Sequence, residues 1–246
     1  MENSPAALTG RAFWSRVALA VLIEATYMVV SRYIIARTGG LLAFDTEVYR
    51  TGLRMAAGLA YWFLLKDLIL SRKATADGLA SPFLLAAIAL NLTISVLAGK
   101  YMLLEGEAMF FAAASIPVAF KEEFFFRGIL QNVIARKRSH GSAIFITNIV
   151  FTAYHIGVGP EGIDYGIIFM AGALFSFIYA RTGNIWVVIS LHALDDALLS
   201  FSPYIQPTWH PGKAFILLAA PSAVLALIWA RGFMRRAAMA GKASRP

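Results

Sequence analysis

Hydrophobic residues along this chain are gathered into long runs that short polar connections separate. Most runs are close to the roughly 20 residues that a helix needs to cross a hydrocarbon core. They are too long, and alternate too little, to be barrel strands, and backbone polar groups in lipid must be satisfied within each segment. The pattern therefore predicts an all-α fold, a polytopic membrane bundle of about eight transmembrane helices. The predicted spans are Phe13–Ile35, Leu53–Leu70, Pro82–Ala98, Ala108–Ile134, Ala143–Val158, Ile163–Tyr179, Ile185–Phe201 and Ala214–Ala230.

Composition supports a membrane protein without a separate soluble domain. The chain is 59% hydrophobic and 15% charged, whereas soluble domains carry about a quarter charged residues. We therefore interpret residues 1–246 as a single integral membrane domain, with the chemically distinctive region at about 108–201. The first run follows Arg11 and Arg16, but it continues to about Ile35 without a convincing small-residue cleavage site. It is predicted to be a retained helix and not a signal peptide.

The net charge of +8 is attributed to loops beside anionic lipid, and no nucleic-acid partner is expected. With eight spans, the opposite side carries Glu105, Glu107, Glu161 and Asp164. The positive-inside rule then predicts a multi-pass protein of the cell membrane with both termini in the cytoplasm. Arg37 and Arg50 are exceptions, because they fall on the outer side. The predicted cytoplasmic charges are Arg72, Lys73, Arg136, Lys137, Arg138, Arg181, Arg231, Arg235, Arg236, Lys242 and Arg245.

Three charged residues, Glu122, Glu123 and Arg127, lie within the fourth run. A charged side chain at membrane depth costs at least about 2.5 kcal/mol, so these residues need compensation or a function. Glu123 and Arg127 are four residues apart, in the order that favours an ion pair on a helix. Glu122 points in another direction and stays available as a general base. The alternative is a buried ion cluster that only fixes helix packing.

Two later runs each carry a histidine that could handle protons. His155 shares a helix face with Asn148 and Phe151, and Phe151 is expected to pack against the imidazole ring. His192 is four residues before Asp196 and three before Asp195, so either carboxylate can reach the ring. Such a pair can orient an imidazole or bind an oxyanion. The alternative is a packed core histidine, with an aspartate that ends the helix.

Taken together, these motifs resemble the CPBP family. Glu122-Glu123-x-x-x-Arg127, Phe151-x-x-x-His155 and His192-x-x-x-Asp196 follow one another on successive predicted helices. The family comprises type 2 CAAX prenyl proteases and bacteriocin-processing enzymes, and is also called the glutamic intramembrane protease or ABI family. The resemblance implies eight helices and a metal-independent peptidase without a cofactor. Its substrates would be membrane-associated peptides or proteins, cleaved near a terminus as in CAAX-like, leader or sorting-tail processing.

The resemblance also implies a role for each residue of the motifs. Glu122 would activate water with help from His155, and Glu123 and Arg127 would support the geometry. His192 and Asp196 would form the oxyanion site. The family most often has Asn at the place of Asp196, and an ionised Asp cannot donate a hydrogen bond. Asp196 would therefore be protonated, or would orient His192, or the activity is altered.

The same residue types also occur in other kinds of site. Glutamate and two histidines can bind zinc, but the sequence has no His-Glu-x-x-His and no cysteine. The sequence also has no Gly-x-Ser-x-Gly motif, so it does not indicate a serine protease. The non-enzyme alternative is an inactive membrane scaffold or an ion-coupled transporter. In that case the polar residues of the first three spans would matter, namely Glu24, Lys66, Asp67 and Asn91, which otherwise form internal polar pairs or lie at helix ends.

Overall fold

The computed structural model describes residues 10–40, 43–70, 106–156 and 165–200. All regular structure within these ranges is helical, which agrees with the predicted all-α class. The helices are α1 (Gly10–Arg37), α2 (Phe44–Ile69), α5 (Gly106–Glu123), η1 (Phe124–Gln131), α6 (Asn132–Ala135), α7 (His140–Tyr154), α8 (Tyr165–Thr182) and α9 (Ile185–Ser200). The predicted spans Pro82–Ala98 and Ala214–Ala230 lie outside the described residues.

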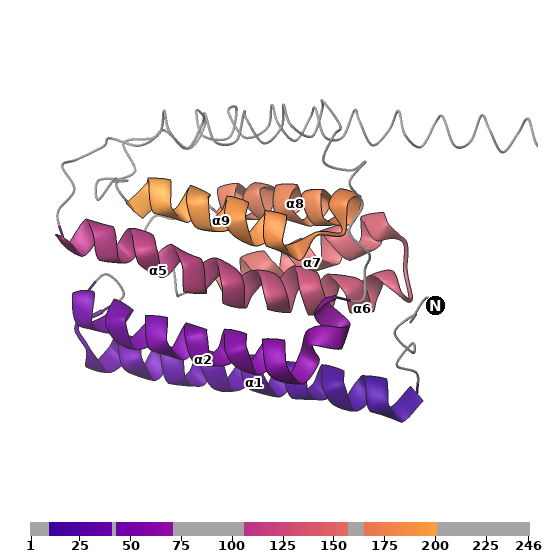
Figure 1. Cartoon of the computed structure of the whole chain (residues 1–246), viewed down its shortest axis with the longest axis horizontal. Helices are drawn as coiled ribbons and strands as arrows, with labels where there is room; N and C mark the ends of the chain where they lie inside the picture. The colour runs from indigo at the N-terminus through magenta and orange to yellow at the C-terminus, as the bar shows by residue number, and fades with distance from the viewer. Residues whose placement is uncertain (1–9, 41–42, 71–105, 157–164, 201–246) are drawn as a thin grey trace, which may run out of the picture.

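The described helices form two groups on either side of α5 (Figure 1). The antiparallel pair α1 and α2 lies on one side, and α8 and α9 lie on the other. Helix α5 packs closely along both α2 and α9, while α7 packs against α8. This central position of α5 matters for function, because α5 carries Glu122 and Glu123 at its C-terminal end.

One prediction about helix bounds was wrong in an informative way. The second span was predicted to begin at Leu53, but α2 begins at Phe44. Arg50 therefore lies inside a helix and is buried, with its Nε donating to Ser31 Oγ of α1 at 3.1 Å. Arg54 forms an ion pair with the buried Glu47. Arg50 is consequently not the outer loop charge that the topology prediction had treated as an exception.

The fourth run, predicted as a single helix, contains a change of helix type. α5 ends at Glu123, and the next eight residues, η1, form a π-helix before α6 resumes the α form. π-Helical turns are rare and are found frequently at functional sites. Here the change begins directly after the two glutamates and contains Arg127.

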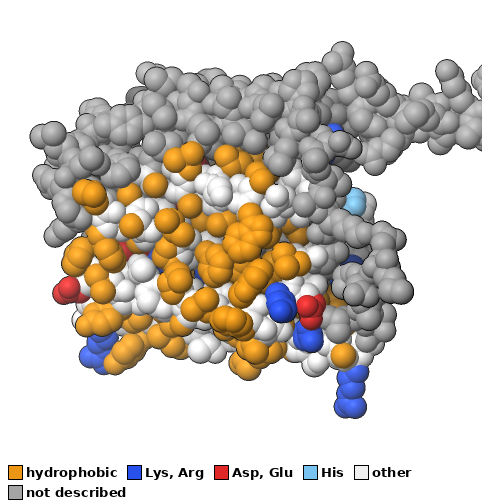
Figure 2. All heavy atoms as spheres, in the orientation of Figure 1, with side chains coloured by type: hydrophobic (Ala, Val, Ile, Leu, Met, Phe, Trp, Pro, Cys, Tyr) orange, Lys and Arg blue, Asp and Glu red, His pale blue; other side chains and the backbone are white. Residues whose placement is uncertain are grey.

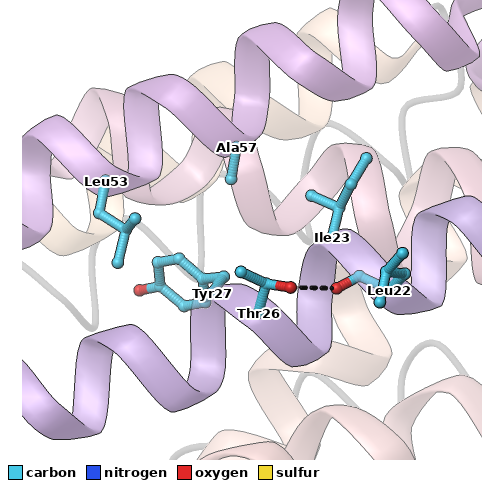
Figure 3. A pocket seen from close by; sticks show the side chains of 6 residues that line it. All are labelled: Leu22, Ile23, Thr26, Tyr27, Leu53 and Ala57. Carbon is cyan, nitrogen blue, oxygen red and sulfur yellow. Dashed lines mark hydrogen bonds between the residues drawn. The ribbon is translucent and has the colours of Figure 1, made fainter.

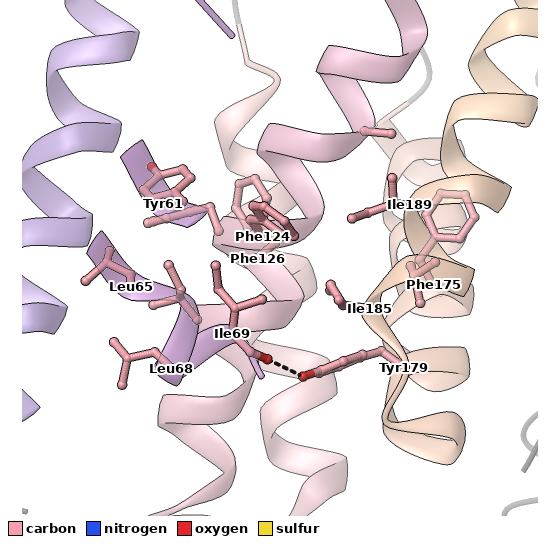
Figure 4. Packing of buried hydrophobic residues seen from close by; sticks show 14 of the residues in the cluster. Tyr61, Leu65, Leu68, Ile69, Phe124, Phe126, Phe175, Tyr179, Ile185 and Ile189 are labelled. Atoms are coloured by element: carbon pink, nitrogen blue, oxygen red, sulfur yellow. Dashed lines mark hydrogen bonds between the residues drawn. The ribbon is translucent and has the colours of Figure 1, made fainter. Parts of the chain in front are cut away.

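The apolar core lies between α2, η1, α8 and α9 (Figure 4). Leu65, Leu68 and Ile69 of α2 face the rings of the Phe124 to Phe126 segment. Small residues let the helices approach closely. A Cβ on Gly58 would lie 2.5 Å from the Phe120 ring, and one on Gly172 would lie 2.6 Å from Asn148 Oδ1.

The outer surface of the described part exposes many hydrophobic side chains (Figure 2). Judged by length and apolar composition, one described helix, α1 near the N-terminus, could cross a membrane, and α8 contains a shorter apolar stretch, Ile168–Thr182. The count of eight spans stays a prediction. An open apolar groove between α1 and α2 is lined by Leu22, Ile23, Thr26, Tyr27, Leu53 and Ala57 (Figure 3).

Candidate active site

Glu123 is at the centre of a buried ionic cluster that joins two helices. Its Oε1 accepts a hydrogen bond from Arg127 Nη1 at 2.9 Å, which confirms the predicted i, i+4 pair. The same oxygen lies 2.7 Å from Nδ1 of His192 on α9. Oε2 is buried and has no hydrogen-bond partner among the described residues. The side chains of Glu123 and Arg127 are fully buried, so each depends on the other for compensation of its charge.

Arg127 contacts α7 and α8 as well as Glu123, although its Nε has no hydrogen-bond partner among the described residues. Its Nη2 donates to the carbonyl oxygen of Gly172 on α8 at 2.8 Å. Its guanidinium lies over the rings of Phe151 and Phe175, with the Cζ atom 4.6 and 5.8 Å from the two ring centres. A side chain at position 172 would collide with Asn148 and Phe151, so glycine permits this close contact. Sequence reasoning missed Gly172 and Phe175 as parts of the site.

Glu122 is buried like its neighbour but has a different environment. Its carboxylate interacts electrostatically with His155 and His192, and more weakly with Lys121 and Arg54. None of the hydrogen bonds within the described part of the chain uses this carboxylate. The two adjacent glutamates therefore differ: Glu123 is held by hydrogen bonds, whereas Glu122 interacts with the histidines electrostatically.

His155 lies directly after the last residue of α7 and is partly exposed. Its Nδ1 is 2.8 Å from the carbonyl oxygen of Phe151, and the Phe151 ring packs edge-on against the imidazole at 4.6 Å. A carbonyl oxygen can only accept, so Nδ1 carries the proton in the neutral ring and Nε2 is left as an acceptor. Phe151 thus orients the histidine through both its backbone and its ring.

His192 lies between two carboxylates. Nδ1 faces Glu123, and Nε2 is 3.4 Å from Asp196 Oδ2, so the predicted proximity of His192 and Asp196 is present. The imidazole stacks on the Phe175 ring at 5.0 Å. The Asp196 side chain is 33% exposed, whereas Asp195 is buried. Both residues also interact with other groups of the protein.

The structure thus brings together side chains from three separate predicted spans. Asn148 is buried, but it bonds to the Ile144 carbonyl of its own helix and to Ser176, and so acts in packing. Among the described residues, no group of three or more His, Asp or Glu side chains has an arrangement that could hold a metal ion.

Comparison with known proteins relates part of the chain to a described family. Residues 104–198 match the model of a family described as type II CAAX prenyl endopeptidase Rce1-like. The match supports membership in the CPBP/CAAX protease family. It covers α5 to most of α9, and therefore all three motifs, whereas α1 and α2 lie outside it. No curated protein and no solved structure matches the chain.

Proposed function

We propose that this CPBP-family protein is a metal-independent intramembrane endopeptidase in which Glu122 and His155 activate water. One observation carries the proposal. Five cationic or imidazole groups act electrostatically on Glu122, and four of them have another carboxylate partner. These four pairs are Lys121 with Glu24, Arg54 with Glu47, His192 with Glu123, and Arg127 with Glu123.

His155 is the exception, because its partner is a backbone carbonyl. A carboxylate and an imidazole that are both otherwise uncommitted form a pair suited to moving one proton. In the proposed step, the water oxygen bonds to the scissile carbonyl carbon while its proton passes to Glu122. When the tetrahedral intermediate collapses, the C–N bond breaks and the leaving nitrogen takes a proton from the same pair.

His192 is proposed to stabilise the oxyanion of that intermediate. Its Nε2 lies 3.4 Å from Asp196, a long contact that an oxyanion can replace or share. Asp196 would then orient the ring and would not itself donate. Glu123 and Arg127 hold His192 from the opposite side of the ring.

The proposed substrates are membrane-associated peptides cleaved near a terminus, either CAAX-like tails or leader and sorting sequences. The description of the matching family favours a CAAX-like tail as the first probe. Exposed apolar side chains and the apolar helix α1 support a location in the membrane. The distribution of Lys and Arg along the sequence is the reason for proposing several passes and cytoplasmic termini.

The test uses the purified full-length chain in nanodiscs with a fluorogenic farnesylated CAAX peptide. Glu122→Gln keeps the size of the side chain but removes its basicity, so kcat should fall at least the roughly 10²-fold typical of losing a general base. His155→Ala and His192→Ala should do the same without loss of purified yield. Asp196→Asn should retain or increase activity, because Asn also positions the ring and can donate to the oxyanion.

Two results would contradict these assignments. Full activity of Glu122→Gln together with an inactive Asp196→Asn variant would make Asp196 the base. If the wild-type chain hydrolyses neither this peptide nor any leader or sorting-tail peptide, the alternatives become an inactive scaffold or an ion-coupled transporter.

A further inference from the structure

A second buried polar cluster lies beside the candidate active site. Lys121 is completely buried, and its Nζ forms an ion pair with Glu24 of α1. The same Nζ donates to the hydroxyl of Tyr154 on α7 at 2.7 Å. Tyr61 of α2 donates to the other oxygen of Glu24 at 2.6 Å. The Tyr27 ring of α1 covers the ammonium at 3.9 Å from its centre.

The positions of these residues in the sequence connect the cluster to the site. Lys121 directly precedes Glu122, and Tyr154 directly precedes His155. The Lys121–Tyr154 hydrogen bond therefore joins α5 to α7 one residue away from each member of the proposed proton-handling pair. α7 packs mainly against α8, η1 and α6, so this hydrogen bond is a direct and directional connection between α5 and α7.

We infer that Lys121, held by Glu24 and Tyr154, is a positioning residue that sets the separation of Glu122 and His155. The inference rests on the proposed function. Lys121 is buried on all sides and cannot touch substrate, so it acts through the two residues that follow it and Tyr154. Glu24 gives α1, which lies outside the family match, a part in the geometry of the site.

The neighbouring charges leave Lys121 little freedom to choose another partner. Glu122 is close enough to interact with it electrostatically, but the hydrogen bond goes to Glu24. If Glu24 were absent, the Lys121 ammonium would turn toward Glu122 and neutralise the proposed base. Glu24 therefore also keeps the Glu122 carboxylate available.

A double variant separates positioning from simple charge compensation. Lys121→Met or Glu24→Gln alone leaves one buried charge without its partner and is expected to lower yield. The double variant Glu24→Gln/Lys121→Met has no unpaired charge, so its yield and melting temperature should recover. We expect kcat on the farnesylated CAAX peptide to stay about 10²-fold below wild type, the loss that an ångström-scale misplacement can cause, with KM unchanged.

Tyr154→Phe removes only the hydroxyl and keeps the ring over the ammonium. It should lower kcat by itself, and adding it to the double variant should produce no further loss, because both changes break the same connection. The matched control is Arg16→Gln/Asp67→Asn. This ion pair joins α1 to α2 at 2.8 Å, but it is exposed and includes none of the motif residues, so kcat should not change.

Helix spacing gives a readout that does not depend on catalysis. The chain contains no cysteine, so spin labels can be placed on cysteines introduced at the exposed positions Ile116 of α5 and Val150 of α7. The distance distribution measured by pulsed electron paramagnetic resonance should broaden or shift in Glu24→Gln/Lys121→Met and stay unchanged in the control.

The outcomes separate this inference from the proposed function. Wild-type kcat and an unchanged label distance in the double variant would overturn the positioning role while leaving the peptidase intact. A label distance that changes in a chain with no peptidase activity in any form would support the positioning of α5 against α7, but overturn the proposed function.

Discussion

Replacing Glu123 with Gln tests how the buried ionic cluster is compensated. The exchange keeps the shape of the side chain but removes the carboxylate that is hydrogen-bonded to the fully buried Arg127. At 2.9 Å and an effective dielectric constant of about 20, the attraction between two unit charges is about 6 kcal/mol. Part of the lost attraction is offset, because the amide oxygen of Gln still accepts one hydrogen bond. We therefore expect a loss of about 3–5 kcal/mol, as measured when one partner of a buried pair is removed.

The measurement is the free energy of unfolding in detergent, followed by tryptophan fluorescence against denaturant. A loss of this size is a large part of the roughly 5–15 kcal/mol that stabilises a typical protein. The second variant, Glu123→Gln/Arg127→Met, removes both charges and should regain most of the stability, since replacing a whole buried pair is often neutral. Arg16→Gln breaks an exposed pair and should change stability by less than about 1 kcal/mol.

Two results would refute this reasoning. If the free energy of unfolding of Glu123→Gln is within about 1 kcal/mol of the wild-type value, the carboxylate is not what compensates the charge of Arg127. If the double variant is no more stable than the single one, the loss comes from the hydrogen bond between Glu123 and His192, or from packing, and not from an unpaired guanidinium.

Three further predictions follow from the fold and the sequence. Gly172→Ala places a methyl group 2.6 Å from Asn148 Oδ1 and 2.8 Å from the Phe151 ring. It should therefore lower the free energy of unfolding by about 1–3 kcal/mol and impair peptide hydrolysis. An unchanged melting temperature would show that α7 and α8 separate easily. Reporter fusions placed after Arg138 and after Arg236 should both indicate the cytoplasm, and opposite sides would mean that the span count is wrong. A strong chelator should leave peptidase activity intact, whereas loss that added zinc restores would favour a metalloprotease.

Much of the helical architecture could be predicted because apolar runs and helices have nearly the same bounds. The start of α2 could not, because Glu47 and Arg50 interrupt the apolar pattern before Leu53 and look like loop residues. In the structure these charges are buried together against α1. Hydropathy counts each charge as a separate cost, whereas charges that compensate one another in space can stay within a helix.

The site was predictable to the extent that its contacts lie within single helices. A spacing of four residues was sufficient for Glu123 with Arg127 and for His192 with Asp196. The contact between Glu123 and His192 crosses from α5 to α9 and depends on how those helices pack, which no spacing reveals. Lys121 went unnoticed for the same reason, although it directly precedes the two glutamates, because its partners come from α1 and α7.

Charge compensation also links the family-matched segment to the helices that precede it. That segment carries Lys121, whose only described carboxylate partner is Glu24 of α1. Without α1, the ammonium would be buried without its ion-pair partner one residue away from Glu122, a costly arrangement that also places a competing cation beside the proposed base. In the proposed mechanism the motifs therefore specify the reacting groups, while Glu24 of α1 keeps the proposed base free of a competing cation.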